Sequence, residues 1–161
     1  MTNTISFIVY GRPEPQGSSR AFVIAGRAHI TSANKKLKPY RQEVAGAAIV
    51  ARDAAGVCGV FAPKHVPVFA EFRFYFERPP SIPKRRVQHV VKPDIDKLVR
   101  ASLDAITGIL LCDDAQVVEL IAKKFYGSPA RVEITVRIAQ DNELPTANKE
   151  TPCQTLLLAS E

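Results

Sequence analysis

Four aspartates stand in two close pairs in a chain that otherwise carries an excess of positive charge. Asp94 and Asp96 lie in the segment KPDIDKLVR, and Asp113 and Asp114 lie in LLCDDAQVVEL. Carboxylates that converge in a fold repel one another unless protons, basic side chains or a cation lie between them. Mg²⁺ accepts a few carboxylate oxygens and shares its other positions with water and phosphate, so the pairs suggest a metal site for phosphate chemistry. On composition alone, helix caps and solvated turns are the commoner roles of such aspartates.

The basic residues are unevenly distributed along the chain. The net charge is +6, but residues 139–161 carry −3, so residues 1–138 carry +9. Two segments, 11–41 and 78–100, hold most of this charge, and the second leads directly into the first aspartate pair. Basic excess of this kind attracts nucleic-acid backbones irrespective of sequence. The candidate DNA-contacting residues are Arg12, Arg20, Lys84, Arg85, Arg86, Lys92 and Lys97.

Length and composition exclude several classes of protein. The 161 residues, 46% of them hydrophobic, suit one domain with a sizeable core. No apolar run approaches the roughly 20 residues of a membrane span, and the first residues do not resemble a signal peptide, so we expect a cytoplasmic protein without a membrane segment. The three cysteines, Cys58, Cys112 and Cys153, form no CxxC pattern, which argues against a disulfide framework and a zinc site. The three histidines are scattered and receive no catalytic role.

Hydrophobic periodicity predicts an α+β fold in a single domain over residues 1–138. Strict alternation from Val66 to Glu77 predicts the most secure strand, with Phe72, Phe74 and Phe76 facing the core. We expect a mixed β-sheet with two main helices packed on it, in the order β-β-β-α-β-α-β-β, followed by a polar tail at 139–161. The predicted elements are a strand at 5–10, a hairpin at 21–30, a helix at 34–55, a helix from 95 to Gly108, and a hairpin of strands 117–126 and 131–138.

Helix geometry constrains how the aspartates can meet. Inside one helix, Asp94 and Asp96 would point about 200° apart, so they converge only if Asp94 lies in the loop and Asp96 in the first turn. Pro93 favours that arrangement because it suits a helix entrance. Asp113 and Asp114 immediately precede a predicted strand, where adjacent side chains point oppositely, so only one of them should face the first pair.

Two further charged residues lie on the predicted helix that follows the first pair. Arg100 stands one turn beyond Asp96, where it could balance the carboxylates or contact a scissile phosphate. An ordinary i,i+4 ion pair is the alternative. Asp104, one turn further along, is assigned to a pair with Arg100 or to solvent.

The motif from Pro93 to Glu119 resembles the signature of the RusA family of Holliday-junction resolvases, phage and prophage endonucleases that cut four-way DNA junctions using Mg²⁺. The similarity covers Asp-x-Asp, LDAITG and DDAQVVE, and the loop GRPEPQGSSRAF is similar to that of phage members. The resemblance extends over roughly residues 4–138. It implies that Asp94, Asp96 and Asp114 are the catalytic metal ligands for Mg²⁺, which Mn²⁺ could replace, with Asp113 the weaker candidate.

Two positions depart from the family pattern. Arg100 stands where the family often has lysine; an arginine cannot serve as a general base, although it can neutralise charge that develops on a phosphate. Ser19 stands where a basic residue is expected before Arg20.

The resulting prediction is a metal-dependent endodeoxyribonuclease that resolves Holliday junctions in DNA recombination and repair. Asp94, Asp96, Asp114 and Arg100 are the predicted catalytic residues. Because a four-way junction has approximate twofold symmetry and must be cut on two strands, we expect a homodimer. Two alternatives stay open: a nuclease for other branched DNA such as flaps and forks, and a catalytically inactive basic DNA-binding protein whose aspartates are merely caps.

Overall fold

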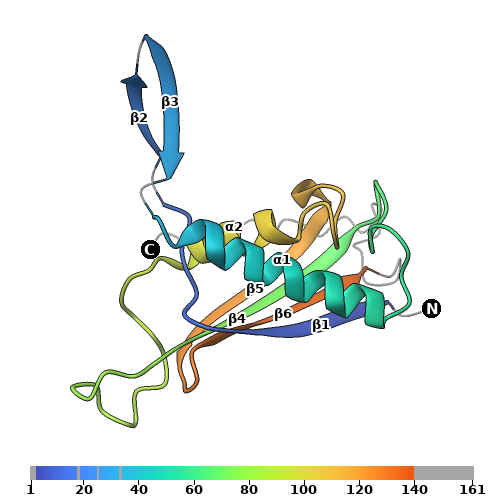
Figure 1. Ribbon diagram of the computed structural model, residues 1–161. Coiled ribbons are helices and arrows are strands. Elements are labelled where there is room, and N and C mark those ends of the chain that lie inside the picture. The colour runs from blue at the N-terminus through green and yellow to red at the C-terminus, as the bar shows by residue number, and fades with distance from the viewer. Residues whose placement is uncertain (1–2, 18, 25, 33, 140–161) are drawn as a thin grey trace, which may run out of the picture.

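The computed structural model describes residues 3–17, 19–24, 26–32 and 34–139, so most of the predicted tail lies outside the described residues. The α+β fold, the mixed sheet and the two main helices are confirmed, in the predicted order (Figure 1). The elements are β1 (Thr4–Tyr10), β2 (Ser19–Ile24), β3 (Arg27–Ser32), α1 (Leu37–Ala54), β4 (Val68–Phe76), α2 (Ile95–Ile106), the 3-10 turn η1 (Asp114–Gln116), β5 (Val117–Tyr126) and β6 (Arg131–Ile138).

The main sheet has four strands in the order β1-β6-β4-β5. β1 pairs antiparallel with β6 and β6 antiparallel with β4, whereas β4 pairs parallel with β5. Helices α1 and α2 lie on one face of this sheet, and the β2–β3 ribbon projects away from the body (Figure 1). The order leaves β1 and β5 as the two edge strands.

The core lies between the helices and one face of the sheet. Phe72 and Phe74 on β4 are fully buried, as the alternation predicted, and Val44 of α1 and Leu98 of α2 pack in the same cluster. Where the helices meet, the buried hydroxyl groups of Tyr40 and Ser102 share a 2.8 Å hydrogen bond. Burial raises the pKa of Tyr40 well above its usual range, so this side chain stays neutral.

The predicted hairpin of β5 with β6 is wrong. The two strands are adjacent in sequence, but β4 lies between them in the sheet. Their connection crosses the end of β4, where the Gly127 amide donates to the Phe76 carbonyl at 2.9 Å. A Cβ atom on Gly127 would lie 2.8 Å from the ring of Tyr75, so this close crossing requires glycine. Alternation identified the second of these strands, residues 131–138, but carries no information about its partners.

The entrance of α1 differs slightly from the prediction. The helix begins at Leu37, three residues after the predicted start, with Pro39 accommodated in its first turn. Asn34 instead ties the entrance to the loop after β1, because its side-chain amide donates to the Pro15 carbonyl at 3.1 Å and to the Glu14 carboxylate at 3.0 Å. This contact holds the Gly/Pro-rich loop against the helical layer.

Candidate nucleic-acid and metal site

The first aspartate pair lies at the start of α2, as helix geometry required. Asp94 is the extended residue that precedes the helix, and Asp96 lies in its first turn. The Asp94 carboxylate makes no capping hydrogen bond and instead forms a 2.8 Å ion pair with Lys97. This hydrogen bond, more than the added attraction of the neighbouring cations, lowers the pKa of Asp94 and keeps the carboxylate ionised.

Lys124 on β5 anchors the chain immediately before Asp94. Its ammonium group donates to the carbonyl oxygens of Val91 at 2.7 Å and Pro93 at 2.6 Å. Burial lowers the pKa of Lys124, while the charge of Asp94 acts in the opposite direction. Sequence reasoning missed this residue, since a lysine in a strand, next to a second lysine, gives no sign of a partner some thirty residues away.

A cleft of about 360 Å³ brings Asp94 together with predicted phosphate-binding residues. Lys92, Lys97 and Arg12 line it beside Asp94, and the loop at 13–17 forms its other wall. The loop is fixed there by the Gln16 amide, which donates to the Lys97 carbonyl at 2.9 Å. Three cations outnumber the two carboxylates of the lining, Asp94 and Glu14, which makes the cleft suitable for a phosphate group next to a metal ligand.

A second cavity of about 510 Å³ adjoins this cleft, and Arg12 and Lys92 line both. Its walls include the aromatic residues Tyr10, His89 and Tyr126. His89 is buried, with its ring 4.3 Å from that of Phe76 and 4.8 Å from that of Tyr126. Burial is the main cause that lowers the pKa of His89, so the imidazole is neutral near pH 7.

The second aspartate pair is held by Gln116, another residue that sequence reasoning missed. The buried Gln116 side chain accepts from the amides of Cys112 at 2.8 Å and Asp113 at 3.0 Å, and donates to the carbonyls of Pro63 at 2.7 Å and Val66 at 2.9 Å. It therefore fastens the turn before β5 to the loop before β4.

The two members of the second pair have different surroundings. The Asp113 carboxylate caps η1 by accepting from the Ala115 amide at 2.9 Å. Asp114 is exposed and has no ion pair or side-chain hydrogen bond with the described residues. Asp113 thus has the capping role that composition favours, whereas the Asp114 carboxylate is available to a ligand.

The expectation that the two pairs meet within one chain is wrong. Asp94 follows the Pro93 carbonyl that Lys124 holds near the far end of β5, whereas Asp114 lies three residues before the first residue of β5, Val117. The strand from Val117 to Lys124 spans about 23 Å. Figure 1 shows the start of α2 and the turn before β5 at opposite ends of the helix. Among the described residues, no group of three or more Asp, Glu, His or Cys side chains is placed to hold a metal ion.

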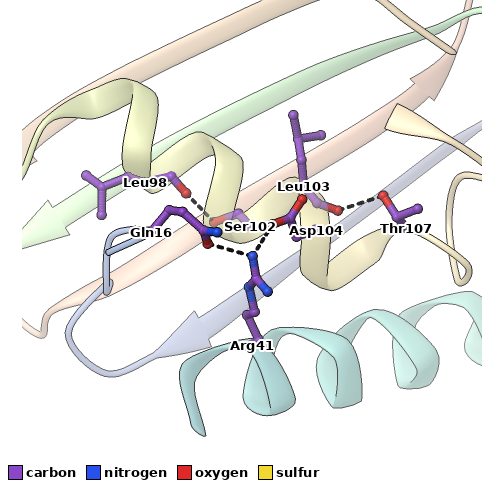
Figure 2. A network of polar contacts seen from close by, with 7 residues as sticks. All are labelled: Gln16, Arg41, Leu98, Ser102, Leu103, Asp104 and Thr107. Carbon is purple, nitrogen blue, oxygen red and sulfur yellow. Dashed lines mark hydrogen bonds and ion pairs between the residues drawn. The ribbon is translucent and has the colours of Figure 1, made fainter. Parts of the chain in front are cut away.

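The two remaining charged residues of α2 lie apart from each other. Arg100 is exposed and has no ion-pair partner among the described residues. The assignment of Asp104 to Arg100 or to solvent is wrong: Asp104 pairs with Arg41 of α1, whose guanidinium also donates to the Gln16 side chain at 2.6 Å (Figure 2). The packing of α1 against α2 brings these partners together across 63 positions of sequence.

Three of the other predicted DNA contacts lie outside the cleft. Lys84, Arg85 and Arg86 are exposed on the long loop between β4 and α2. Arg78 donates to the Arg86 carbonyl at 3.0 Å and thereby supports the basic part of the loop. Arg20 falls on β2, and its side chain lies outside the described part of the structure.

Comparison with known proteins identifies the family of this chain. A family model described as endodeoxyribonuclease RusA matches residues 12–137, a range that includes both aspartate pairs and every cleft residue named above. The chain belongs to the RusA family. RusA proteins are endodeoxyribonucleases of branched DNA, so the protein is a member of a DNA hydrolase family. It is also 31% identical over 143 residues to an uncharacterized protein, YqaN, of Bacillus subtilis (strain 168), covering 83% of this chain and 95% of that one.

None of the helices within the described ranges is both long and apolar enough to span a membrane.

Proposed function

We propose that the protein is a Mg²⁺-dependent Holliday-junction resolvase that makes paired phosphodiester cuts during DNA recombination and repair. One observation carries the proposal: Asp94 shares a cleft with Lys92, Lys97 and Arg12, inside the region that matches the RusA family. The carboxylate supplies an oxygen ligand for a hard cation, and the three cations can hold the phosphate to be cut.

The metal ligands that we propose are Asp94, Asp96 and Asp114, with Mn²⁺ as an alternative to Mg²⁺. A bound divalent cation supplies a water of lowered pKa and stabilises the leaving oxygen. Of these three carboxylates only Asp94 lines the cleft, and no group of three or more Asp, Glu, His or Cys side chains among the described residues is placed to hold a metal ion, so the set does not fit a complete metal site within a single protomer. Asp94 suits the role because its lowered pKa keeps it ionised.

The basic residues divide into two groups by their position. Lys92, Lys97 and Arg12 lie in the cleft and are proposed to hold the scissile strand, and Arg100 is proposed to stabilise charge that appears on the phosphate. The aromatic walls of the adjoining cavity suit stacking of an unpaired base next to that strand. The residues proposed to hold the junction arms are Lys84, Arg85, Arg86 and Arg20.

A homodimer in the cytoplasm is part of the proposal. Two cuts on a twofold-symmetric junction call for two copies of the site related by the same symmetry. Leu120 and Ile121 on the edge strand β5 are 46% and 40% exposed, which supplies apolar surface for such an assembly.

Cleavage of synthetic DNA substrates tests this function. Four-way junctions, flaps, forks and linear duplexes are each incubated with Mg²⁺, Mn²⁺ or Ca²⁺. We expect symmetric paired nicks in the four-way junction with Mg²⁺ or Mn²⁺, and none with Asp94→Asn. Asp53→Asn, at an exposed position near the end of α1, is the matched control and should cut normally. Preferential cutting of flaps or forks would support the first alternative, and junction binding without metal-dependent cutting would support the inactive DNA-binding protein.

A further inference from the structure

We propose that the aromatic cavity, the space of about 510 Å³ that adjoins the cleft, is a pocket for one unpaired DNA base. In this pocket Glu77 selects a base that carries an exocyclic amino group. Adenine, cytosine and guanine carry such a group, whereas thymine has carbonyl oxygens and a methyl group instead. The inference rests on the proposed function, because the base belongs to the strand whose phosphate lies in the cleft.

The position of the aromatic cavity places a base next to a bound phosphate. Arg12 and Lys92 line both the cavity and the cleft, so the two spaces adjoin along these side chains. In a DNA strand the sugar joins each base to the phosphates on either side of it. A phosphate held by Arg12 and Lys92 therefore presents a neighbouring base to the cavity. Contacts to phosphate position a strand, whereas contacts to a base edge read its sequence.

The walls of the aromatic cavity suit a flat, aromatic ligand. Phe76, His89 and Tyr126 are at most 7% exposed, and the His89 ring lies 4.3 Å from the Phe76 ring and 4.8 Å from the Tyr126 ring. Packing thus fixes this part of the wall. Tyr10, at the end of β1, lines the same cavity and is 64% exposed, so its ring is open to stacking with a base.

Glu77 supplies an unpaired hydrogen-bond acceptor in the aromatic cavity. It lies directly after β4 and is exposed. Its carboxylate forms no ion pair or hydrogen bond with the described residues, whereas Asp94 in the cleft pairs with Lys97 at 2.8 Å. An ionised carboxylate only accepts hydrogen bonds, so Glu77 attracts amino groups and repels carbonyl oxygens.

The same features argue against a phosphate as the occupant. The unpaired charge of Glu77 repels phosphate oxygens, and aromatic rings offer them few hydrogen-bond donors. A base with an amino group suits both parts of the cavity, because its ring stacks on Tyr10 and its amino group donates to Glu77. Taking a base out of the DNA stack costs least where the base is already unpaired, as it can be at the crossover of a junction.

Cutting of junctions that differ in one base pair provides the first test. Each nucleotide beside the cut is changed in turn to each of the four bases, and single-turnover rates are measured at saturating protein with Mg²⁺. We expect thymine at one of these positions to slow cutting at least about fivefold relative to cytosine, the lower end of what one base contact contributes. Glu77→Gln should bring the two rates to within about twofold of each other, because its amide also donates to the thymine oxygen.

Asp53→Asn, another change of an exposed carboxylate to an amide, is the matched control and should keep the wild-type ratio of rates. Equal rates for all four bases in the wild type would overturn the proposal. A ratio that Glu77→Gln leaves unchanged would overturn the role of Glu77.

A binding experiment needs neither metal nor cutting. Junctions with cytosine or thymine opposite an abasic site, at each position beside the crossover in turn, are titrated in EDTA by fluorescence anisotropy. The wild type should bind the cytosine junction more tightly at one position, and Glu77→Gln should bind both junctions equally. Tyr10→Ala should weaken binding of both, whereas Tyr10→Phe keeps the stacking surface and should bind as the wild type does.

The two experiments separate the base pocket from the nuclease function. Junction cutting without any dependence on the base, in rate or in binding, would overturn the pocket and leave the nuclease function standing. Base-selective binding that depends on Glu77, without junction cutting, would support the pocket and contradict the function.

Discussion

Replacing Gln116 by alanine should destabilise the turn that carries Asp114 without touching the cleft at Asp94. The side chain is 8% exposed and makes four hydrogen bonds of 2.7 to 3.0 Å to backbone groups of the turn before β5 and of the loop before β4. A hydrogen bond contributes about 0.5–1.5 kcal/mol, so the loss of four should lower the free energy of unfolding by about 2–6 kcal/mol. Partial solvation of the freed groups favours the lower half of this range.

Urea denaturation followed by circular dichroism measures this change. An equal dependence of the unfolding free energy on urea concentration in variant and wild type shows that the unfolded state is unaltered. Gln42→Ala, at an exposed position of α1, is the matched control and should change stability by less than about 0.5 kcal/mol. A Gln116→Ala protein as stable as this control would refute the structural role assigned to Gln116.

Three further results are expected. Arg100→Ala should lower the cleavage rate more than it weakens junction binding, because its proposed role is specific to the transition state; equal losses in single-turnover kinetics and binding titrations would make it a plain phosphate contact. Changing Lys84, Arg85 and Arg86 together to alanine should weaken binding and reduce its salt dependence by up to about 0.9 logarithmic units of slope per lost contact, and an unchanged slope would place the DNA elsewhere. His89 binds its proton less readily in the folded protein, so the free energy of unfolding should fall as pH drops below the ordinary histidine pKa of about 6.5, and His89→Gln should flatten that dependence in urea titrations at several pH values.

The parts of the fold that could be predicted are those encoded by local periodicity. Alternation along β4 identified its buried face. Helical spacing with Gly108 predicted both ends of α2 to within two residues of those observed. The pairing of strands could not be predicted in the same way, because β5 and β6 follow each other across a short turn as a hairpin would while β4 separates them. Alternation fixes the face of a side chain but leaves its neighbour undetermined.

The candidate site shows the same division. The sequence placed Asp94 before the helix and Asp96 in its first turn because Pro93 and the helical repeat act locally. Lys124 and Gln116, which position the two acidic segments, could not be predicted because their partners are some 30 to 50 residues away. The separation of the aspartate pairs has the same cause: it depends on the direction of β5 within the sheet.

The rate of paired nicking of a four-way junction by Asp114→Asn and Asp113→Asn tests the central claim most directly. The rates are measured at saturating protein with Mg²⁺, beside the wild type. Asparagine can still cap η1 at position 113, so Asp113→Asn should cut at close to the wild-type rate. Asp114→Asn should bind the junction and fail to cut it, because it lacks a metal ligand. Normal cutting by Asp114→Asn together with loss of cutting by Asp113→Asn would contradict the proposed site.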